Sequence, residues 1–393
     1  MNLKSLLEVM MEDGASDLHL KAGSRPVVRV DGVLNPIDRP VVTAKDLETM
    51  TEEILTPRQQ ETLREERELD LAFGIQGLAR FRANIYYQRG TLALAIRFVP
   101  LGVPALDELN LPPILEKLAL LNRGLVLITG TVGSGKSTTL ASMIDLLNRT
   151  HARKVITIED PVEFLHRDDR SSISQREVGQ DAPSYHDGLK HVLRQDPDVI
   201  MLGEIRDRET MGVSLMAADT GHVVMSTLHT VDAARTINRC LSFYPPDQHE
   251  EVRYLLSNTL AGVVSLRLLP RKDGKGRIPA AEVLINTPTV KEFLLDPSKT
   301  PRIYEAMAEG AHTYGMQTFD QSLMKLYTEG WIALEDALSH ATNATEFKLR
   351  VDGVESASDG TWRGFQDGTG SGPKAMGTPG RGDAASRWFR FDA

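Results

Sequence analysis

The clearest pattern along the chain is a series of short, continuously apolar runs that begins near Gly124. Segments long enough to form helices separate these runs from one another. A strand that is apolar throughout must be covered on both faces, and strands joined by helices usually run parallel. The pattern therefore predicts an α/β fold with a parallel sheet between two helical layers, and places its strands at residues 125–128, 155–158, 199–202 and 223–225.

Two longer apolar segments follow at residues 261–268 and 280–285, and they flank the sequence Asp273-Gly274-Lys275-Gly276. Aspartate and glycine between two apolar segments predict a hairpin, which we expect to extend the same sheet. Residues 290–350 show the spacing of helices. These segments together define a predicted domain over residues 114–351.

The first 100 residues show shorter patterns that alternate between the periods of strands and helices. Helices are predicted between residues 43 and 66, where Pro57 opens the second of them. Strands are predicted at 16–20, 26–30, 81–87 and 92–97, and the last two form a hairpin around Arg89-Gly90. The mixture predicts a small α+β domain over residues 1–100.

Two further segments are marked by composition. Prolines crowd the stretch after residue 99, and because proline interrupts helices and central strands we expect a linker over residues 101–113. After Val351 the chain becomes rich in glycine with scattered serine, threonine and proline. Such a composition cannot bury enough apolar surface to fold, so residues 352–393 are predicted to be a disordered tail.

Charge and cysteine content narrow the class of protein. Of 393 residues, 54 are acidic and 45 basic, a balance that disfavours nucleic acid as the main partner. A single cysteine, Cys240, excludes a disulfide within the chain and a four-cysteine zinc site. No run approaches the roughly 20 apolar residues of a membrane span, and residues 1–11 lack the features of a signal peptide. We expect a cytoplasmic protein with, at most, peripheral membrane contact.

A glycine-rich loop lies between the strand at 125–128 and the helix that follows. A polyphosphate needs several N–H donors that converge on it, and glycines let the backbone approach that closely while the helix N-terminus faces the anion. Lys136 would place its charge on the β and γ phosphates, and the Ser137 hydroxyl would bind Mg²⁺. The loop predicts an ATP site formed by Gly130, Thr131, Val132, Gly133, Ser134, Gly135, Lys136, Ser137 and Thr138.

Acidic residues follow two other predicted strands. Glu204 comes just after the strand at 199–202, at the edge where a parallel sheet binds its ligands, so we expect it to hold Mg²⁺ directly or through water. The strand at 155–158 is followed by Glu159, Asp160 and Glu163. Hydrolysis needs a carboxylate that orients or deprotonates water. Glu163 is our choice for this role, with Glu159 and Asp160 as competitors.

Two histidines, His222 and His229, lie on one predicted strand segment. Their separation of seven residues points the two side chains to opposite faces of a strand. We therefore reject a metal site made by this pair. His229, at the end of the strand, is expected to sense the γ-phosphate, whereas His222 is at least as well explained as a packed side chain.

With these segments in place, residues 1 to about 350 closely resemble the secretion-type ATPases that drive type IV pili, and within them the retraction (twitching motility) branch of PilT and PilU. The resemblance rests on the glycine-rich loop, on the acidic segment 159–163, and on the segments 203–207 and 220–229. Gln175-Arg176-Glu177-Val178-Gly179 and Gly315-Met316-Gln317-Thr318-Phe319-Asp320 also look like stretches of that branch.

This resemblance implies a homohexameric ATPase with a PAS-like N-terminal domain and a RecA-like P-loop core. It implies that ATP lies between the two domains and is completed by a neighbouring subunit. In this family the residue that matches Glu163 activates water, and the residue that matches Glu204 helps to hold Mg²⁺. The residues that match Arg82 and Arg97 reach the γ-phosphate. The partners implied are the inner-membrane platform protein of the pilus and a paralogous retraction ATPase.

Two departures refine the expectation. Assembly ATPases of the superfamily often carry a four-cysteine zinc element, which the lone Cys240 excludes, so retraction is favoured. PilT-like enzymes carry a C-terminal motif that begins Ala-Ile-Arg, and here residues 290–295 differ, while 326–330 and 335–338 look more like the accessory PilU type. The alternatives are a nucleotide-binding regulatory subunit of a paralogous ATPase and a RecA-like DNA motor, which the acidic balance disfavours.

Overall fold

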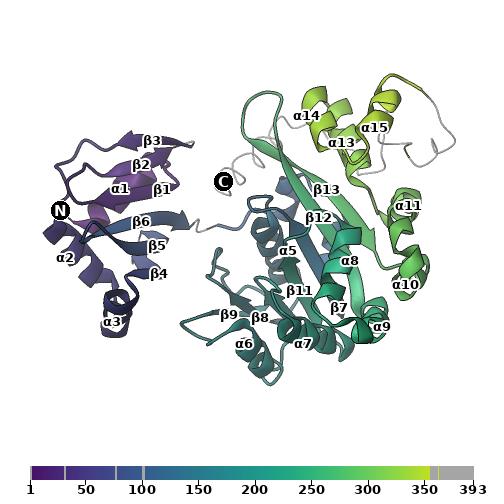
Figure 1. Ribbon diagram of the computed structural model, residues 1–393, viewed down its shortest axis with the longest axis horizontal. Helices are drawn as coiled ribbons and strands as arrows, with labels where there is room; N and C mark the ends of the chain where they lie inside the picture. The colour runs from purple at the N-terminus through teal and green to yellow at the C-terminus, as the bar shows by residue number, and fades with distance from the viewer. Residues whose placement is uncertain (1, 31, 76–77, 100–101, 355–361, 363–393) are drawn as a thin grey trace. The chain divides into compact units, whose positions relative to one another are not determined.

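The chain folds into two compact units. The computed structural model describes residues 2–30, 32–75, 78–99, 102–354 and 362. The first unit contains the described residues up to Gly102 together with Pro161–Leu165, and the second contains Val103–Asp160 and the described residues from His166 onward. Figure 1 shows the first unit in purple and blue and the second from blue through green to yellow.

The first unit is an antiparallel sheet with helices on one face. Within the described residues its strand order is β3-β2-β1-β6-β5-β4, and each neighbouring pair is antiparallel. Apolar side chains from the helices pack against inward-facing strand residues such as Phe81 and Ile96. The elements are α1 (Leu3–Glu12), β1 (Asp17–Lys21), β2 (Val27–Val30), β3 (Val33–Pro36), α2 (Ala44–Ile54), α3 (Pro57–Glu66), β4 (Glu68–Ile75), β5 (Ala79–Gln88) and β6 (Thr91–Val99).

Local signals account for most of these elements. Pro57 is the first residue of α3, where its missing N–H costs nothing, so the predicted break between the two helices is confirmed. The β5–β6 hairpin is also confirmed, and Arg89 and Gly90 both adopt positive φ at its turn. Strands β3 and β4 were not predicted: every residue of β3 is exposed, and Leu71 is the only residue of β4 that is buried.

The second unit is built on a mixed sheet. Within the described residues the order is β13-β12-β7-β11-β10-β8-β9, and every pair is parallel except the antiparallel β12–β13 hairpin. The predicted parallel strands and the added hairpin are confirmed, whereas the polar edge strand β9 was not predicted. The strands are β7 (Gly124–Gly130), β8 (Lys154–Glu159), β9 (Ser172–Glu177), β10 (Val199–Leu202), β11 (Val223–Leu228), β12 (Leu260–Pro270) and β13 (Arg277–Ile285).

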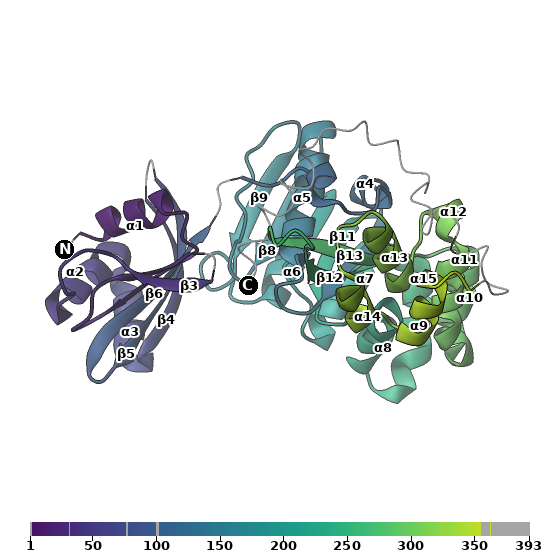
Figure 2. The same ribbon diagram turned by 90° about the horizontal axis from the view of Figure 1, so that it is seen from above.

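Helices cover both faces of this sheet, which confirms the predicted α/β fold. Alternate strand residues point to two separate cores: Val126 and Ile128 pack with α5, while Leu125 and Leu127 pack with the helices opposite. Figure 2 shows α5 and α8 on opposite sides of the sheet. The helices of these two layers are α4 (Ile114–Ala119), α5 (Lys136–Thr150), α6 (Tyr185–Val192), α7 (Arg208–Asp219), α8 (Ala233–Ser242) and α9 (His249–Thr259).

Further helices follow the β12–β13 hairpin, as the sequence predicted. They are α10 (Pro288–Leu295), α11 (Ile303–Glu309), α12 (Ala311–Tyr314), α13 (Phe319–Thr328), α14 (Leu334–His340) and α15 (Ala344–Val351). Short 3₁₀ turns are η1 (Leu106–Leu109), η2 (Pro246–Gln248) and η3 (Pro297–Arg302). No helix in the described ranges is long and apolar enough to span a membrane.

The structure differs from the sequence prediction in the linker expected over residues 101–113. From Val103 onward this stretch belongs to the second unit, and Leu106 and Leu109 of η1 are buried in its core beside α4 and α5. The linker was predicted from the prolines alone. Leu106 and Leu109 nevertheless pack against apolar side chains of α4 and α5.

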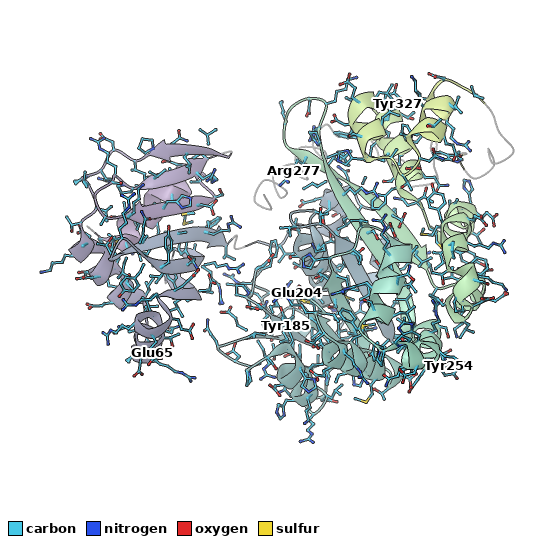
Figure 3. All side chains as sticks on the ribbon, viewed as in Figure 1. Glu65, Tyr185, Glu204, Tyr254, Arg277 and Tyr327 are labelled. Carbon is cyan, nitrogen blue, oxygen red and sulfur yellow. The ribbon has the colours of Figure 1, made fainter. Side chains whose placement is uncertain are left out.

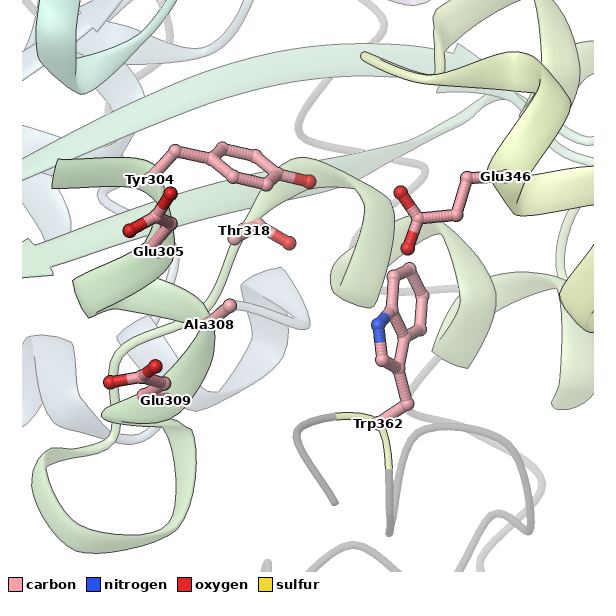
Figure 4. A pocket seen from close by; sticks show the side chains of 7 residues that line it. All are labelled: Tyr304, Glu305, Ala308, Glu309, Thr318, Glu346 and Trp362. Carbon is pink, nitrogen blue, oxygen red and sulfur yellow. The ribbon is translucent and has the colours of Figure 1, made fainter. Parts of the chain in front are cut away.

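The predicted tail, residues 352–393, lies outside the described residues except for 352–354 and Trp362. The Trp362 ring is buried, 4.4 Å from the guanidinium carbon of Arg350. It borders a small pocket that is also lined by Tyr304, Thr318 and Glu346 (Figure 4).

Candidate active site

The glycine-rich loop joins β7, which is buried along its whole length, to α5. Gly130 adopts a φ of 149°, and a Cβ atom there would lie 2.3 Å from Ser134 Oγ and 2.6 Å from the Leu266 carbonyl oxygen. The chain can therefore turn this tightly only with glycine at residue 130. Gly135, with a φ of 93°, then leads directly into α5, so the helix begins at Lys136.

Lys136 is buried inside the curve of this loop. Its Nζ atom donates hydrogen bonds to the carbonyl oxygens of Gly130, at 3.0 Å, and Thr131, at 2.7 Å. Ser134 Oγ is buried and makes no hydrogen bond within the part of the chain that the structure describes. A positive charge, an unpartnered hydroxyl and the N-terminus of a 15-residue helix converge here, which is the donor set that a phosphate group requires.

The register of the sheet brings the other predicted residues to the same edge. Leu202 pairs with Ile158 on one side and Ser226 on the other, and Leu228 pairs with Thr129. The residues that follow these strands therefore leave the carboxyl edge of the sheet together, where open α/β sheets bind their ligands. At this edge lie Glu159, the last residue of β8, Glu204 after β10, His229 after β11 and the loop after β7.

Glu204 is held by two partners at this edge. Its Oε1 atom forms an ion pair with Arg206, and its Oε2 atom lies 3.2 Å from Nε2 of His229. Burial opposes ionisation of the carboxyl, but the hydrogen bond and charge of Arg206 and the contact with His229 outweigh it, so the pKa of Glu204 is lowered. The carboxylate is thus ionised at neutral pH, the form in which it can bind a divalent cation.

The competing acids differ in their surroundings. Glu159 is buried, and its Oε1 atom accepts hydrogen bonds from Thr157 Oγ1, at 2.6 Å, and Gln175 Nε2, at 3.1 Å. Asp160, the next residue, is exposed. A carboxylate that already accepts two protein hydrogen bonds is less free to bind water, so the geometry disfavours Glu159 as the base.

Two residues beside Glu204 were missed by the sequence reasoning. Arg206 lies in the segment 203–207 but was assigned no role of its own, and Tyr185 was assigned none. Burial, with the nearby Asp160 and Glu204 carboxylates, raises the pKa of Tyr185, so its hydroxyl stays protonated as a donor. A Cβ atom on Gly203 would lie 2.6 Å from that hydroxyl, and Figure 3 shows Tyr185 next to Glu204. Only the fold brings them together, since Tyr185 and Glu204 are 19 positions apart in the sequence.

The two histidines are placed apart. His229 contacts Glu204 as described, whereas Nδ1 of His222 lies 2.9 Å from the Ala217 carbonyl oxygen near the end of α7. His222 is thus a packed residue at the start of the β11 segment.

The remaining predicted residues belong to the first unit. Arg82 and Arg97 are directly opposite each other on β5 and β6, and Nε of Arg97 donates to Asp17 Oδ1 at 2.9 Å. Glu163 is exposed and lies in the segment Pro161–Leu165, which is grouped with that unit.

Comparison with known proteins assigns the chain to a family. The model of the family described as type II/IV secretion system protein matches residues 2–363. The chain belongs to this family. It is 40% identical to the type IV pilus ATPase PilU of Pseudomonas aeruginosa over 362 residues, which cover 91% of this chain and 94% of that protein.

Two further comparisons agree. This member of the type II/IV secretion system family is 40% identical to the retraction ATPase PilT of the same organism, over 87% of this chain and 98% of that protein. A crystal structure of the pilus retraction motor PilT with bound ADP matches with a TM-score of 0.83 and 41% identity, over 88% of this chain and 98% of that one. The chain is an ATPase of this family.

Proposed function

We propose that this ATPase powers the retraction of type IV pili, as twitching motility requires, and that it acts as an accessory motor of the PilU kind. The observation that carries the proposal is the 40% identity to PilU and to PilT over nearly the whole of both proteins. A loop with the donor set for a phosphate, beside an ionised Glu204, supports hydrolysis of ATP at the same place.

The phosphates of ATP would be held by the backbone N–H groups of residues 130–138 and by Lys136. Ser134 adds an unpartnered hydroxyl within the same loop. The Ser137 hydroxyl, in the first turn of α5, and the Glu204 carboxylate would hold Mg²⁺, the latter directly or through water. When bound, Mg²⁺ stabilises the negative charge that develops on the transferred phosphoryl group.

Hydrolysis would be assisted by Glu163 as the residue that activates water. Glu163 is exposed at the surface, where water can reach it, whereas Glu159 is buried. His229 would sense the γ-phosphate, and its contact with Glu204 would link that sensing to the metal ligand.

The larger architecture follows from the family. The first unit would be a PAS-like domain over residues 1–100, and the second a RecA-like P-loop core over 114–351, assembled as a homohexamer in which a neighbouring subunit completes each ATP site. Arg82 and Arg97 would reach the γ-phosphate. Their cross-strand pairing, and the ion pair that orients Arg97, support a joint role for these two residues.

A mixing experiment tests the shared site. Arg82→Ala and Lys136→Ala subunits, each inactive alone, should regain ATPase activity when combined, because about a quarter of interfaces in randomly mixed rings recover both groups. The measurement is steady-state ATP hydrolysis by rings shown by tagged subunits to be mixed. If such rings remain inactive, Arg82 does not act across the interface.

The partner of the motor would be the platform protein at the cytoplasmic face of the inner membrane, and a PilT-type ATPase would work alongside it. The stretch that replaces the Ala-Ile-Arg motif forms most of α10. Its altered sequence is the reason for assigning an accessory role. The same observation favours a second candidate, a regulatory subunit that binds nucleotide and modulates a paralogous ATPase.

A deletion strain separates the two candidates. If the protein is an accessory motor, its deletion should lower twitching motility, and more strongly under load or when the PilT-type partner is weakened. The Lys136→Ala protein should then fail to restore motility. Restoration of full motility by the Lys136→Ala protein would leave the regulatory role, because regulation by binding alone needs no turnover.

A further inference from the structure

Glu282 is a buried carboxylate in the middle of β13 that the proposed chemistry does not use. Ser265 of β12 lies between it and the glycine-rich loop: Ser265 pairs with Glu282 on one side and with Thr129 on the other. Thr129 Oγ1 donates to Ser265 Oγ at 2.8 Å inside the core. A polar row therefore crosses three strands, from the residue that precedes Gly130 to Glu282.

The Glu282 carboxylate accepts hydrogen bonds from the first residues of two helices. Ala233, which begins α8, donates its N–H to Oε1 at 2.8 Å, and Phe319, which begins α13, donates its N–H as well. A negative charge is favourable at both helix N-termini. Helix α8 starts four residues after His229, and α13 is the first of the three helices α13, α14 and α15, called the C-terminal helices below. Glu282 thus joins the His229 segment to the C-terminal helices.

We call the contacts of Glu282 with the first residues of α8 and α13 the joint. The sequence stretch 315–320, to which the proposed function gives no role, adds further contacts to it. Gln317 exchanges two backbone hydrogen bonds with Val283, and its Nε2 atom donates to the Ala281 carbonyl oxygen at 2.6 Å. Asp320 accepts the N–H groups of Thr342, at 2.6 Å, and Asn343, at 3.1 Å. Hydrogen bonds from this stretch therefore connect the start of α13 both to β13 and to the segment before α15.

The charge of Glu282 is open to titration near neutral pH. Burial, reinforced by Asp232, raises its pKa to about 7, while Arg267 and the two N–H donors act in the opposite direction. The other ionisable groups around this joint are Arg235 of α8, Tyr304 of α11 and Asp320 of α13. Arg267 itself lies over the Phe319 ring, 3.7 Å from its centre.

We propose that Glu282 is a positioning residue for ATP hydrolysis, which fixes the His229 segment through α8 and couples it to the C-terminal helices through α13. This inference rests on the ATPase activity and not on the role in pilus retraction. Because the joint does not touch the phosphate-binding loop directly, it should govern the hydrolytic step and leave nucleotide binding unchanged.

The test is Glu282→Gln in the full-length protein. The amide keeps one acceptor but turns a donor toward the second helix N-terminus, so one of the two hydrogen bonds is lost. We expect kcat for ATP to fall roughly tenfold, with KM for ATP unchanged. The ratio of wild-type to variant kcat should approach one at pH 6, where the wild-type carboxyl is protonated and also carries a donor, and should reach its full value above pH 8.

Val283→Ala is the matched control, because it removes buried side-chain volume from the same strand on the opposite face. It should lower thermal stability without a pH-dependent change in kcat. Gln317 is only partly buried, and Gln317→Ala removes its hydrogen bond to the Ala281 carbonyl oxygen at the same joint. This variant should also lower kcat, and it can be measured even if Glu282→Gln folds poorly. The proposal would be overturned if kcat were unchanged in both Glu282→Gln and Gln317→Ala. It would also be overturned if Val283→Ala lowered kcat as much as these variants do for the same loss of thermal stability.

Discussion

Replacing Lys136 with alanine should lower kcat for ATP hydrolysis by at least about a hundredfold. Its buried ammonium lies inside the loop, bonded to the carbonyl oxygens of Gly130 and Thr131, so its loss removes the positive charge at the position of the β and γ phosphates. The measurement is phosphate release by the purified protein at saturating Mg-ATP.

A control within the same loop separates charge from loop geometry. Val132 is 87% exposed, and Val132→Ala should keep near-wild-type turnover because it removes no donor and leaves the backbone unstrained. Equal activity of the wild-type and Lys136→Ala proteins would refute the assignment of the nucleotide site as a whole.

Separate replacement of Glu163 and Glu204 should distinguish the binding of ATP from its hydrolysis. Glu163→Gln is expected to bind Mg-ATP normally yet to lose about two orders of magnitude in kcat, since a general base contributes roughly that much. Glu204→Ala should weaken Mg²⁺-dependent nucleotide binding as well, because it removes a carboxylate whose lowered pKa keeps it ionised. Titration with a fluorescent ATP analogue, with and without Mg²⁺, measures the difference.

Glu209→Gln is the control for these acids, because Glu209 is exposed in the first turn of α7 and should tolerate the change. Normal turnover in Glu163→Gln would show that the general base is misassigned. Glu159 would then be the next residue to replace, although its two hydrogen bonds argue against it.

The sequence was most informative where one physical demand dominates. Fully buried strands must be apolar, and a loop that turns as tightly as Gly130 does must carry glycine, so the parallel strands and the loop were predictable. The position of Glu204 at the carboxyl edge of the sheet was predictable for a related reason, since it lies two residues after the buried strand β10; its role as a Mg²⁺ ligand stays a prediction. The edge strand β9, by contrast, is polar and gave no apolar signal.

Contacts between distant segments were beyond the sequence pattern. Tyr185 carries no local signal of its place beside Glu204, and Glu282 stands within an apolar strand whose partners, Ala233 and Phe319, come from helices on either side of it in the chain. The buried Leu106 and Leu109 were hidden by the surrounding prolines. Such features depend on the register and packing of the finished fold.

The most direct measurement of the proposed function is a count of surface pili on cells whose chromosomal copy carries Lys136→Ala, in backgrounds with and without the PilT-type partner. An ATPase that helps to withdraw pili predicts more surface pili than in wild-type cells in at least one of these backgrounds, with the variant protein present at normal levels. Cells without pili would identify an assembly motor, and that result would contradict retraction.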